Sequence, residues 1–430
     1  MSALTTAPVL DELSWRGLIY QYTEGLAESL AGAPVSAYCG FDPTAPSLHL
    51  GHLVPVMVLA HLQRAGHKPV ALVGGGTGLI GDPSGRNAER PLASTEQIEH
   101  NARALQAQLE RFLDFEGPAA ARMRDNAAWL TRLGAVEFMR DVGKHFTVNH
   151  MLAKDSVKSR LDIGISYTEF SYMLLQAYDY LELYRREGVT LQVGGSDQWG
   201  NITAGIELIR RTLGSAAGDM HGLTLPLVTT AAGTKFGKSE AGAVWLDPSM
   251  TSPYKFYQFW INTDDRDAGR YLRYFTLLAR EEIEALDAEA AAHPERRAAQ
   301  RALARDVTTR VHGAGTARAA DEVSALLFGG ADAGSLSEAA FIALAGEVPL
   351  ATVPIPAEGA AFDTPDLFVA AALIPSKGAG RRLLDQGGLY VNGARLTAAD
   401  RTISADRILR GEYLLLRKGA RDYCLVRVRD

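Results

Sequence analysis

The sequence of 430 residues has little cysteine and no long apolar run. Its two cysteines, Cys39 and Cys424, lie far apart, which excludes a disulfide framework and a cysteine-based zinc cage and favours a reducing compartment. No stretch approaches the ~20 apolar residues of a membrane-spanning helix, and residues 1–30 lack the basic and apolar parts of an export signal. We therefore expect a cytoplasmic protein without membrane spans.

Length and composition are those of a globular protein with several domains. With 47% hydrophobic and 22% charged residues, the chain can bury large cores, and 430 residues exceed what one core usually organises. We predict four segments: 1–230, an α/β domain with a helical insertion after about residue 88; 231–328, a loop and a helical domain; 329–361, a linker rich in Gly, Ala and Pro; and 362–430, a small α+β domain.

Charge is unevenly distributed along the chain. The net charge is −6, but residues 375–429 hold 12 Lys and Arg against 5 Asp and Glu, so this segment carries +7 and the remainder −13. Lys377, Arg381 and Arg382 lie on a predicted basic helix within it. Phosphate contacts with RNA need a basic face of this kind. A solvated basic surface or a protein-binding module is the alternative.

The first part of the sequence predicts a β-α-β unit. Apolar runs at 35–41 and 68–74 indicate buried strands, and the apolar spacing of 49–65 indicates a helix between them. Such a unit joins parallel strands and gathers ligands at their carboxyl ends. Because Pro55 would remove a hydrogen bond deep inside a helix, we place the helix start near Gly51.

Two histidines, His49 and His52, lie where the first strand turns into this helix, in the sequence HLGH. They share one helical face, and Gly51 permits close approach to the backbone. Helix N-termini offer unpaired N–H groups to anions, so we predict a phosphate site. A metal site would need a third ligand that the neighbouring sequence does not supply, and a plain polar helix start is the alternative.

A glycine-rich loop at 74–85 follows the second strand. Residues 76–81 fit G-x-G-x-x-G, but DPSG directly afterwards favours a turn over the immediate helix that a dinucleotide site requires. We expect a loop that lies against a flat ligand, with Asp82 available to a ribose hydroxyl or an ammonium group. A tight crossover loop without a ligand is the alternative.

Two lysines, Lys235 and Lys238, lie on a second glycine-hinged loop with the sequence GTKFGKS at 233–239. A P-loop has four residues between its glycines and this loop has three, so the Walker pattern is missed. We interpret the lysines as mobile cations that neutralise a polyphosphate leaving group. A solvated loop is the alternative.

Two further patterns predict pocket walls. Tyr172, Gln176 and Asp179, at offsets of 0, 4 and 7, share a helical face among apolar neighbours, where a carboxylate needs hydrogen-bond partners. The segment 194–201, GGSDQWGN, places carboxylate, amide and aromatic side chains on a glycine turn after a strand. An exposed helix flank and an ordinary turn are the respective alternatives.

Together and in this order, these motifs resemble those of bacterial tyrosyl-tRNA synthetases, which are class I aminoacyl-tRNA synthetases with a carboxyl-terminal S4-type RNA-binding domain. HLGH at 49–52 is similar to the HIGH signature and KFGKS at 235–239 to the KMSKS loop of that family. The resemblance covers essentially the whole chain. It implies an α/β fold: a Rossmann-like parallel-sheet catalytic domain, a helical domain that begins at the KMSKS-type loop, and a small α+β S4-like domain.

The resemblance also implies residue roles. The tyrosine phenol would be held by Tyr38 and Asp179, the ammonium group by Asp82, Tyr172 and Gln176, and the carboxylate would lie near Gln198. The ATP side would be lined by Cys39, Gly40, Asp42, Thr44, His49, His52, Gly195, Asp197 and Lys238. The catalytic groups around the phosphates would be His49, His52, Arg86, Arg90, Lys235, Lys238 and Ser239. tRNA would contact Lys154, Lys158, Arg210 and Arg211, and in the terminal domain Lys377, Arg381 and Arg382.

The implied activity is a tyrosine–tRNA ligase. The carboxylate of tyrosine attacks the α-phosphorus of ATP to give tyrosyl-adenylate and pyrophosphate, and a hydroxyl at the 3′ end of tRNA(Tyr) then takes the tyrosyl group. ATP is a substrate, Mg²⁺ accompanies it without an assigned protein ligand, and a cytoplasmic homodimer is implied. The rivals are a tryptophanyl-tRNA synthetase, an NAD-dependent dehydrogenase built on 76–81, and a non-catalytic RNA-binding protein.

Overall fold

The computed structural model describes residues 7–82, 93–158, 164–234, 236–239, 242–329, 331–356 and 361–429. The chain divides into two compact units. Unit 1 comprises Met1–Thr251 and Asn262–Leu303, and unit 2 comprises Ser252–Ile261 and Ala304–Asp430. Apart from the stretch 329–361, which is described below, the division into four segments predicted above stays a prediction.

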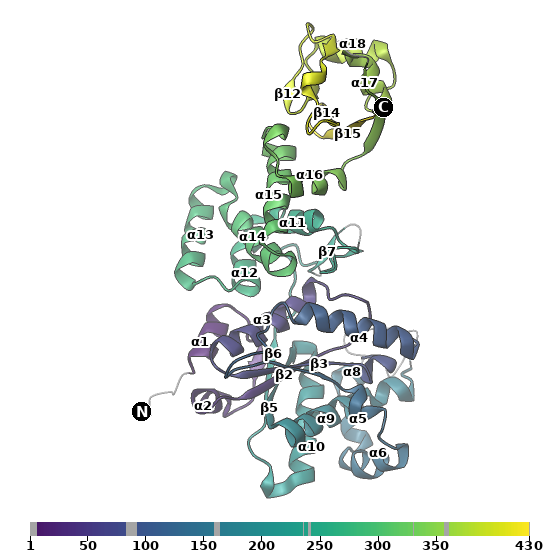
Figure 1. Ribbon diagram of the computed structural model, residues 1–430. Helices are drawn as coiled ribbons and strands as arrows, with labels where there is room; N and C mark the ends of the chain where they lie inside the picture. Colours follow the sequence, from purple (N-terminus) through teal and green to yellow (C-terminus); the bar gives the residue numbers. More distant parts are fainter. Residues whose placement is uncertain are drawn as a thin grey trace. The chain divides into compact units, whose positions relative to one another are not determined.

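Unit 1 is built on a six-stranded sheet with the order β1-β6-β5-β2-β3-β4 (Figure 1). Its strands are β1 (Gln21–Tyr22), β2 (Ser36–Phe41), β3 (Lys68–Val73), β4 (Arg122–Asp125), β5 (Val189–Gly195) and β6 (His221–Leu225). All neighbours are parallel except β1, which pairs antiparallel with β6. The Rossmann-like parallel sheet is therefore confirmed.

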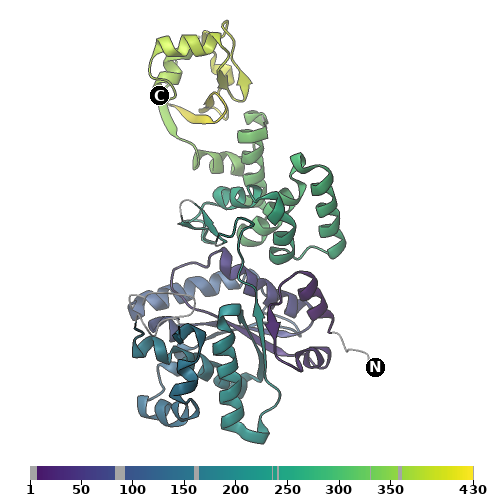
Figure 2. The same ribbon diagram turned by 180° about the vertical axis from the view of Figure 1, so that it is seen from behind.

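Helices cover both faces of this sheet (Figures 1 and 2). Up to β5 they are α1 (Pro8–Trp15), α2 (Leu26–Ala31), α3 (Leu50–Arg64), α4 (Thr95–Leu109), α5 (Ala127–Leu130), α6 (Ala135–Asp141), α7 (Val148–Leu152), α8 (Asp155–Lys158) and α9 (Tyr167–Glu187). Beyond β5, α10 (Trp199–Leu213) also packs on the sheet, whereas α12 (Asp265–Phe275), α13 (Arg280–Ala292) and α14 (Ala298–His312) do not cover its faces, and α14 crosses into unit 2. Tyr38 and Tyr180 belong to the apolar core between the sheet and helices α9 and α10.

Helix α3 confirms the predicted β-α-β unit. It begins at Leu50, one residue from the predicted start, and Pro55 lies inside it. Leu53, Val56 and Leu59 are buried as the apolar spacing predicts. The core thus fixes the orientation of the histidine turn that precedes the helix.

Strand β4 lies inside the segment that was predicted to be helical, and that part of the prediction is wrong. Its sequence, RMRD, has no apolar run because β4 is an edge strand. Arg122 and Arg124 both pair with Glu187, the last residue of α9. The backbone ladder with β3 and these ion pairs, rather than apolar burial, therefore hold this strand, and the hydrophobic pattern could not reveal it.

The strand order places the site. From β2 the chain adds β3 and β4 on one side, and then returns to add β5 and β6 on the other. Strands β2 and β5 are thus neighbours whose connections leave in opposite directions, and the general rule for such sheets places a ligand crevice at their carboxyl ends. Ligand-binding groups are consequently expected among the residues that follow β2 and β5.

Unit 2 combines helices with a five-stranded sheet of order β12-β11-β14-β15-β9. Its strands and helices are α11 (Pro253–Ile261), α15 (Ala314–Gly329), α16 (Glu338–Ala345), β9 (Leu350–Pro354), β10 (Phe362–Asp363), α17 (Thr364–Ala370), α18 (Lys377–Asp385), β11 (Leu389–Val391), β12 (Ala394–Arg395), β13 (Thr402–Ile403), β14 (Tyr413–Lys418) and β15 (Asp422–Arg429). Strands β10 and β13 form a separate small ladder. The expected α+β character of the terminal domain is present.

The stretch predicted as a linker, 329–361, differs from that expectation. It contains α16 and β9, and β9 pairs in parallel with β15, for example Val353 with Val428. Leu415 and Leu425 of the sheet share an apolar core with helices α15 and α16. Apolar residues buried among Gly and Ala make this stretch part of unit 2, which composition alone concealed.

Candidate active site

The crevice between β2 and β5 is framed by residues that directly follow strands. Asp42 follows β2, and Gly74 follows β3. Gly74 has no room for a side chain, because Oδ1 of Asp42 and the hydroxyl of Thr77 occupy the place of a Cβ atom. The glycine loop can therefore close tightly over the end of β2.

Asp42 is held by two hydroxyl groups. The Thr77 hydroxyl donates to its Oδ1 at 2.7 Å, and the Tyr172 hydroxyl donates to its Oδ2 at 2.8 Å. Burial first, and then the carboxylates of Asp42 and Asp82, raise the pKa of Tyr172 well above its usual range. Tyr172 is consequently a neutral donor, and it joins α9 to the end of β2.

Asp179 is the buried acid of the site, with 2% of its surface exposed. Asn126 donates to its Oδ2 at 2.9 Å and the indole N–H of Trp129 donates to its Oδ1 at 2.7 Å. Burial raises the pKa of Asp179 to about 8, although both hydrogen bonds act in the opposite direction. A carboxylate in this position is costly unless a further donor arrives.

Tyr38 supplies a buried hydroxyl near this acid. Tyr38 is 1% exposed, its ring packs edge-on against Tyr180 at 5.3 Å, and its hydroxyl has no hydrogen-bond partner within the described part of the chain. Burial and the neighbouring charge of Asp179 raise the pKa of Tyr38 well above its usual value. Buried polar atoms are nearly always satisfied, so an unsatisfied hydroxyl beside a buried acid indicates a polar ligand.

Gln192 is a residue of the same pocket wall that the sequence analysis did not select. It is the register partner of Tyr38 on β5, is 3% exposed, and its Oε1 also lacks a partner among the residues described. Register partners in adjacent strands project from the same face of the sheet. Gln192 lies within a strand and has no distinctive spacing, so no motif in the sequence indicates it.

A second polar cluster unites three of the predicted motifs. Gln198 donates to Oδ2 of Asp82 at 2.8 Å, and Asn201 donates to Oε1 of Gln176 at 3.0 Å and to Oε1 of Gln198 at 3.1 Å. The glycine loop, α9 and the start of α10 therefore meet here. Asp82 and Gln176, predicted for the ammonium group, and Gln198, predicted near the carboxylate, therefore lie within one hydrogen-bonded chain.

The two histidines stack on each other, with ring centroids 3.9 Å apart. Nδ1 of His52 accepts from the backbone N–H of His49 at 3.1 Å, and Nδ1 of His49 accepts from the N–H of Gly51 at 3.1 Å. Because Nδ1 accepts in both rings, the proton of each neutral ring is on Nε2. Both histidines can thus donate from Nε2 at the helix N-terminus.

The glycine-lysine loop reaches this turn through its backbone. A Cβ atom at Gly237 would be 3.3 Å from Cβ of Leu50, so the two residues lie side by side. Val244 connects them: its N–H donates to the carbonyl of Gly237 at 3.0 Å, and its carbonyl accepts from the N–H of Leu50 at 3.1 Å. Lys238 and Ser239 form the short strand β7 (Lys238–Ser239), which pairs with β8 (Gly242–Ala243). Lys235, Arg86 and Arg90 lie outside the described residues.

The predicted ATP side is more open than the tyrosine side. Thr44 and Asp197 are exposed, and a Cβ at Gly40 would meet no atom within 4 Å. Cys39 is buried, and burial raises its pKa to about 12, so it is not a nucleophile. At Gly195 a side chain would collide with Asp197.

The candidate tRNA contacts lie on helices or, for Lys154, directly before one. In unit 1, Arg210 and Arg211 of α10 share the single carboxylate of Glu207, at 2.7 and 2.6 Å. Lys154 precedes α8 and Lys158 ends it. In unit 2, Lys377 pairs with Asp366 at 2.6 Å, whereas Arg381 and Arg382 project from α18 as exposed side chains.

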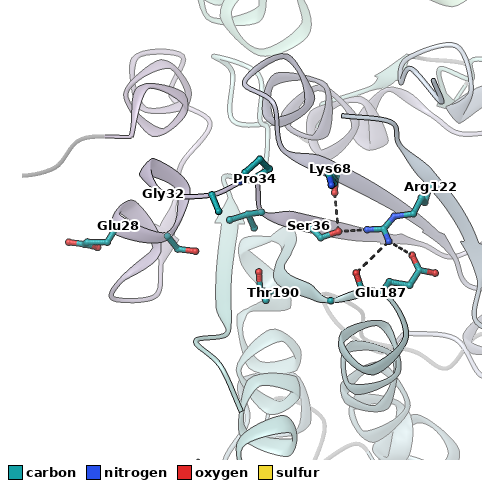
Figure 3. A pocket seen from close by; sticks show the side chains of 12 residues that line it. Glu28, Gly32, Pro34, Ser36, Lys68, Arg122, Glu187 and Thr190 are labelled. Atoms are coloured by element: carbon teal, nitrogen blue, oxygen red, sulfur yellow. Dashed lines mark hydrogen bonds and ion pairs between the residues drawn. The ribbon is translucent and has the colours of Figure 1, made fainter. Parts of the chain in front are cut away.

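A cavity of about 570 Å³ lies at the opposite, amino ends of the strands (Figure 3). Ser36, Lys68, Arg122 and Glu187 line it, and Arg122 pairs with Glu187 at 2.8 Å. None of the predicted site residues contributes to this cavity. It is therefore separate from the candidate active site.

Within the described ranges, no helix is long and apolar enough to cross a membrane. Among the same residues, no group of three or more His, Cys, Asp or Glu is arranged to hold a metal ion.

Family models match nearly the whole chain. Residues 30–329 match the tRNA synthetases class I (W and Y), and residues 343–426 match the tyrosine–tRNA ligase SYY-like C-terminal domain. The fold and the site together define a class I aminoacyl-tRNA synthetase. The second match begins before residue 350, as expected if β9 belongs to the terminal sheet.

Comparison with individual relatives distinguishes between the tryptophan and tyrosine members of this class. The chain is 56% identical over 421 residues to the tyrosine–tRNA ligase of Anaeromyxobacter dehalogenans strain 2CP-1, with 98% of this chain and 99% of that protein covered. It is 51% identical to that of Geobacillus stearothermophilus, with 97% and 99% covered. The solved C-terminally truncated mitochondrial tyrosyl-tRNA synthetase of Aspergillus nidulans is 32% identical, with a TM-score of 0.68 over 74% of this chain and 94% of that one. The chain belongs to the tyrosine–tRNA ligase family.

Proposed function

We propose that this chain attaches tyrosine to tRNA in two steps, with tyrosyl-adenylate as the intermediate. One observation carries the proposal most directly: a buried carboxylate, Asp179, lies near a buried hydroxyl, Tyr38, that has no partner among the described residues. A phenolic O–H fits this pair, because it can donate to Asp179 while it accepts from Tyr38. The tryptophan and phenylalanine side chains cannot do both.

The ammonium group of tyrosine would bind at the second polar cluster. Asp82 supplies the negative charge, and Gln176 supplies a carbonyl oxygen. Tyr172 lies on the same face of α9 as Gln176 and Asp179. The negative charges of Asp42 and Asp82 both raise the pKa of its hydroxyl. Gln198, hydrogen-bonded to Asp82, would then lie near the carboxylate of the amino acid.

Activation requires no protein nucleophile, since the carboxylate of tyrosine is already an anion. It forms a bond to the α-phosphorus of ATP, and the bond from that phosphorus to the bridging oxygen of pyrophosphate breaks. The enzyme then contributes orientation and neutralisation of charge. Nε2 of His49 and His52, the N-terminus of α3, and the lysine loop are the groups that would meet the phosphates.

The remaining catalytic assignments rest on the sequence. Arg86, Arg90, Lys235, Lys238 and Ser239 would close around pyrophosphate, and Cys39, Gly40, Asp42, Thr44, Gly195 and Asp197 would line the nucleotide. Mg²⁺ would accompany ATP on its phosphate oxygens. The described acidic residues do not form a ligand set for it, and no step above depends on a metal bound by the protein.

tRNA binding is proposed for two basic regions. One is formed by Arg381 and Arg382 with Lys377 in the terminal domain, and the other by Lys154, Lys158, Arg210 and Arg211 in unit 1.

A homodimer would form through the helical insertion. Val136, Met139 and Val148 are 79%, 59% and 61% exposed there, which is unusual for apolar side chains so close in sequence. The buried free cysteines agree with a cytoplasmic enzyme.

Amino-acid-dependent exchange of pyrophosphate into ATP tests the proposal. We expect exchange with tyrosine alone among the twenty amino acids, followed by tyrosylation of tRNA(Tyr). Exchange with tryptophan instead would support the rival synthetase. Absence of exchange with any amino acid, from folded protein, would refute the activation step.

A further inference from the structure

One face of helix α12 holds the root of the glycine-lysine loop. Oδ2 of Asp267 accepts from the N–H of Ala231 at 2.8 Å, and its Oδ1 pairs with Arg270 at 2.5 Å. Arg270 in turn donates to the carbonyl of Thr229 at 2.6 Å. Asp267 and Arg270 are three residues apart on α12 and therefore share a face of the helix.

The same helix holds the centre of the loop. Phe236, between the two lysines, is 6% exposed although it lies in a connecting segment. Its ring stacks on Phe275 with centroids 5.0 Å apart, and meets Tyr271 edge-on at 4.9 Å. A buried aromatic side chain of this kind anchors the backbone of Phe236 and of Gly237 next to it.

Helix α12 is itself fixed to the body of unit 1. Arg16, at the end of α1 and 2% exposed, donates to the carbonyls of Arg273, Thr276 and Leu278 at 3.0, 2.9 and 2.7 Å. These carbonyls lie at the carboxyl end of α12 or directly after it, where helix carbonyls lack partners. The helix is therefore a rigid support for the loop.

We propose that Asp267 and Phe236 are positioning residues for the activation step: by fixing residues 229–231 and Phe236 on α12, they place Gly237 against the histidine turn and bring Lys238 to the phosphates. This inference rests on the proposed function. Groups that act mainly on the leaving phosphates contribute in the transition state, so their misplacement lowers kcat without weakening the binding of tyrosine.

Phe236→Ala and Asp267→Ala test the inference in the full-length protein. In tyrosine-dependent pyrophosphate exchange we expect kcat to fall at least tenfold for each, with the Kd for tyrosine, measured by fluorescence titration, within twofold of wild type. Two conservative variants provide rescue. Phe236→Met keeps the buried volume, and Asp267→Asn keeps an acceptor for Ala231, so each should recover part of kcat.

Asp287→Ala is the matched control. Asp287 of α13 pairs with Arg273 of α12 at 2.5 Å, so its loss perturbs the same helix without touching the loop. Thermal unfolding should show a similar shift for Asp287→Ala and Asp267→Ala, but only the latter should lose kcat. Unchanged kcat in both alanine variants, or an equal loss of kcat and tyrosine affinity, would overturn the inference. Failure of the wild-type protein to exchange would instead refute the proposed function.

Discussion

Asn126 donates from its side-chain amide to Oδ2 of Asp179 at 2.9 Å, while its Oδ1 accepts from the N–H of Gly76 at 2.7 Å. One buried amide thus connects the acid of the pocket to the glycine loop. With Trp129 on the other oxygen, the carboxylate has one fixed orientation, and each oxygen retains a lone pair for a further donor. The direction from which a phenol must approach is set before any ligand arrives.

Selectivity for tyrosine should depend on Asp179. A site built to bind a substrate hydroxyl rejects the analogue without it by about 10⁴–10⁵, and tyrosyl-tRNA synthetases are themselves the measured example of about 10⁵ against phenylalanine. Loss of a hydrogen bond to a charged group costs roughly 1.5–3 kcal/mol. We expect Asp179→Ala to lower the ratio of kcat/KM for tyrosine over phenylalanine by about 10–100-fold.

The control for this variant is Glu182→Ala. Glu182 is also a buried carboxylate of α9, 6% exposed, but it pairs with Arg186 at 2.7 Å and contacts no predicted substrate residue. The Glu182→Ala variant should be less stable than wild type but keep its selectivity for tyrosine over phenylalanine. If Asp179→Ala kept the wild-type ratio in pyrophosphate exchange, the assignment of the phenol site would be incorrect.

Tyrosine binding should depend on pH through Asp179. Burial raises the pKa of this carboxyl to about 8, so below pH 8 it is protonated in the unliganded protein and accepts a phenolic hydrogen bond less well. The association constant for tyrosine should rise from pH 6.5 to a plateau above 8, by up to about tenfold per pH unit. Phenylalanine should bind weakly with no such rise, and a flat calorimetric profile for tyrosine would contradict the prediction.

The same raised pKa affects stability in a definite direction. The folded pKa of Asp179 lies above the unfolded value of about 3.9, so the folded state binds the extra proton between these values. The stabilising contribution is complete below pH 4 and is lost as the pH rises through 8. Saturating tyrosine should reduce this loss in urea unfolding at pH 8.5, since it supplies the missing donor.

The sequence predicted most of the crevice because its motifs directly follow strands. Asp42, Asp82 and Gln198 come after apolar runs that identify β2, β3 and β5, and parallel strands bring their carboxyl ends together. Asn126 and Trp129 were missed because the strand before them, β4, has the polar sequence RMRD. Without that strand, nothing in the pattern places residue 126 beside Asp179.

The link between the two phosphate-directed motifs was likewise beyond the sequence. His49 and Gly237 are far apart in the chain, and their segments are brought together by backbone hydrogen bonds through Val244 and by the bridge between His49 and Trp245. Spacing can identify each motif, but it contains no information on this pairing. The resemblance to a family supplied it, and the described backbone agrees with it.

His52 should contribute to kcat more than to tyrosine affinity. Its Nδ1 already accepts from His49, which leaves Nε2 as the donor toward a phosphate. His52→Asn can keep the acceptor but has no counterpart of Nε2, whereas His52→Ala loses both. Removal of one preorganised donor typically costs 10²–10³ in kcat.

Both variants should therefore lower kcat for pyrophosphate exchange by about 10²-fold or more, with little change in the Kd for tyrosine. Full recovery of kcat by His52→Asn would show that the ring only caps the helix. Equal losses in kcat and in tyrosine affinity would contradict a role confined to the transition state.

Recognition of tRNA can be tested on α18 without disturbing the fold. Deletion of 362–430 would leave β9 without its partner β15 and would uncover the core that contains Leu415 and Leu425. Reversal of the exposed charges Arg381 and Arg382 to Glu avoids both effects. Each phosphate contact adds roughly 0.7–0.9 to the slope of log K against log salt, so the slope for tRNA binding should decrease by about 1.4–1.8.

The charge-matched control is Arg296→Glu with Arg301→Glu, two exposed arginines of unit 1. Pyrophosphate exchange should stay at the wild-type rate in both double variants, because neither pair belongs to the predicted tyrosine and ATP sites. Only the α18 variant should raise KM for tRNA in the charging reaction. An unchanged salt slope in that variant would show that tRNA uses another face of the terminal domain, and equal effects of both variants would indicate a loss of general electrostatic attraction.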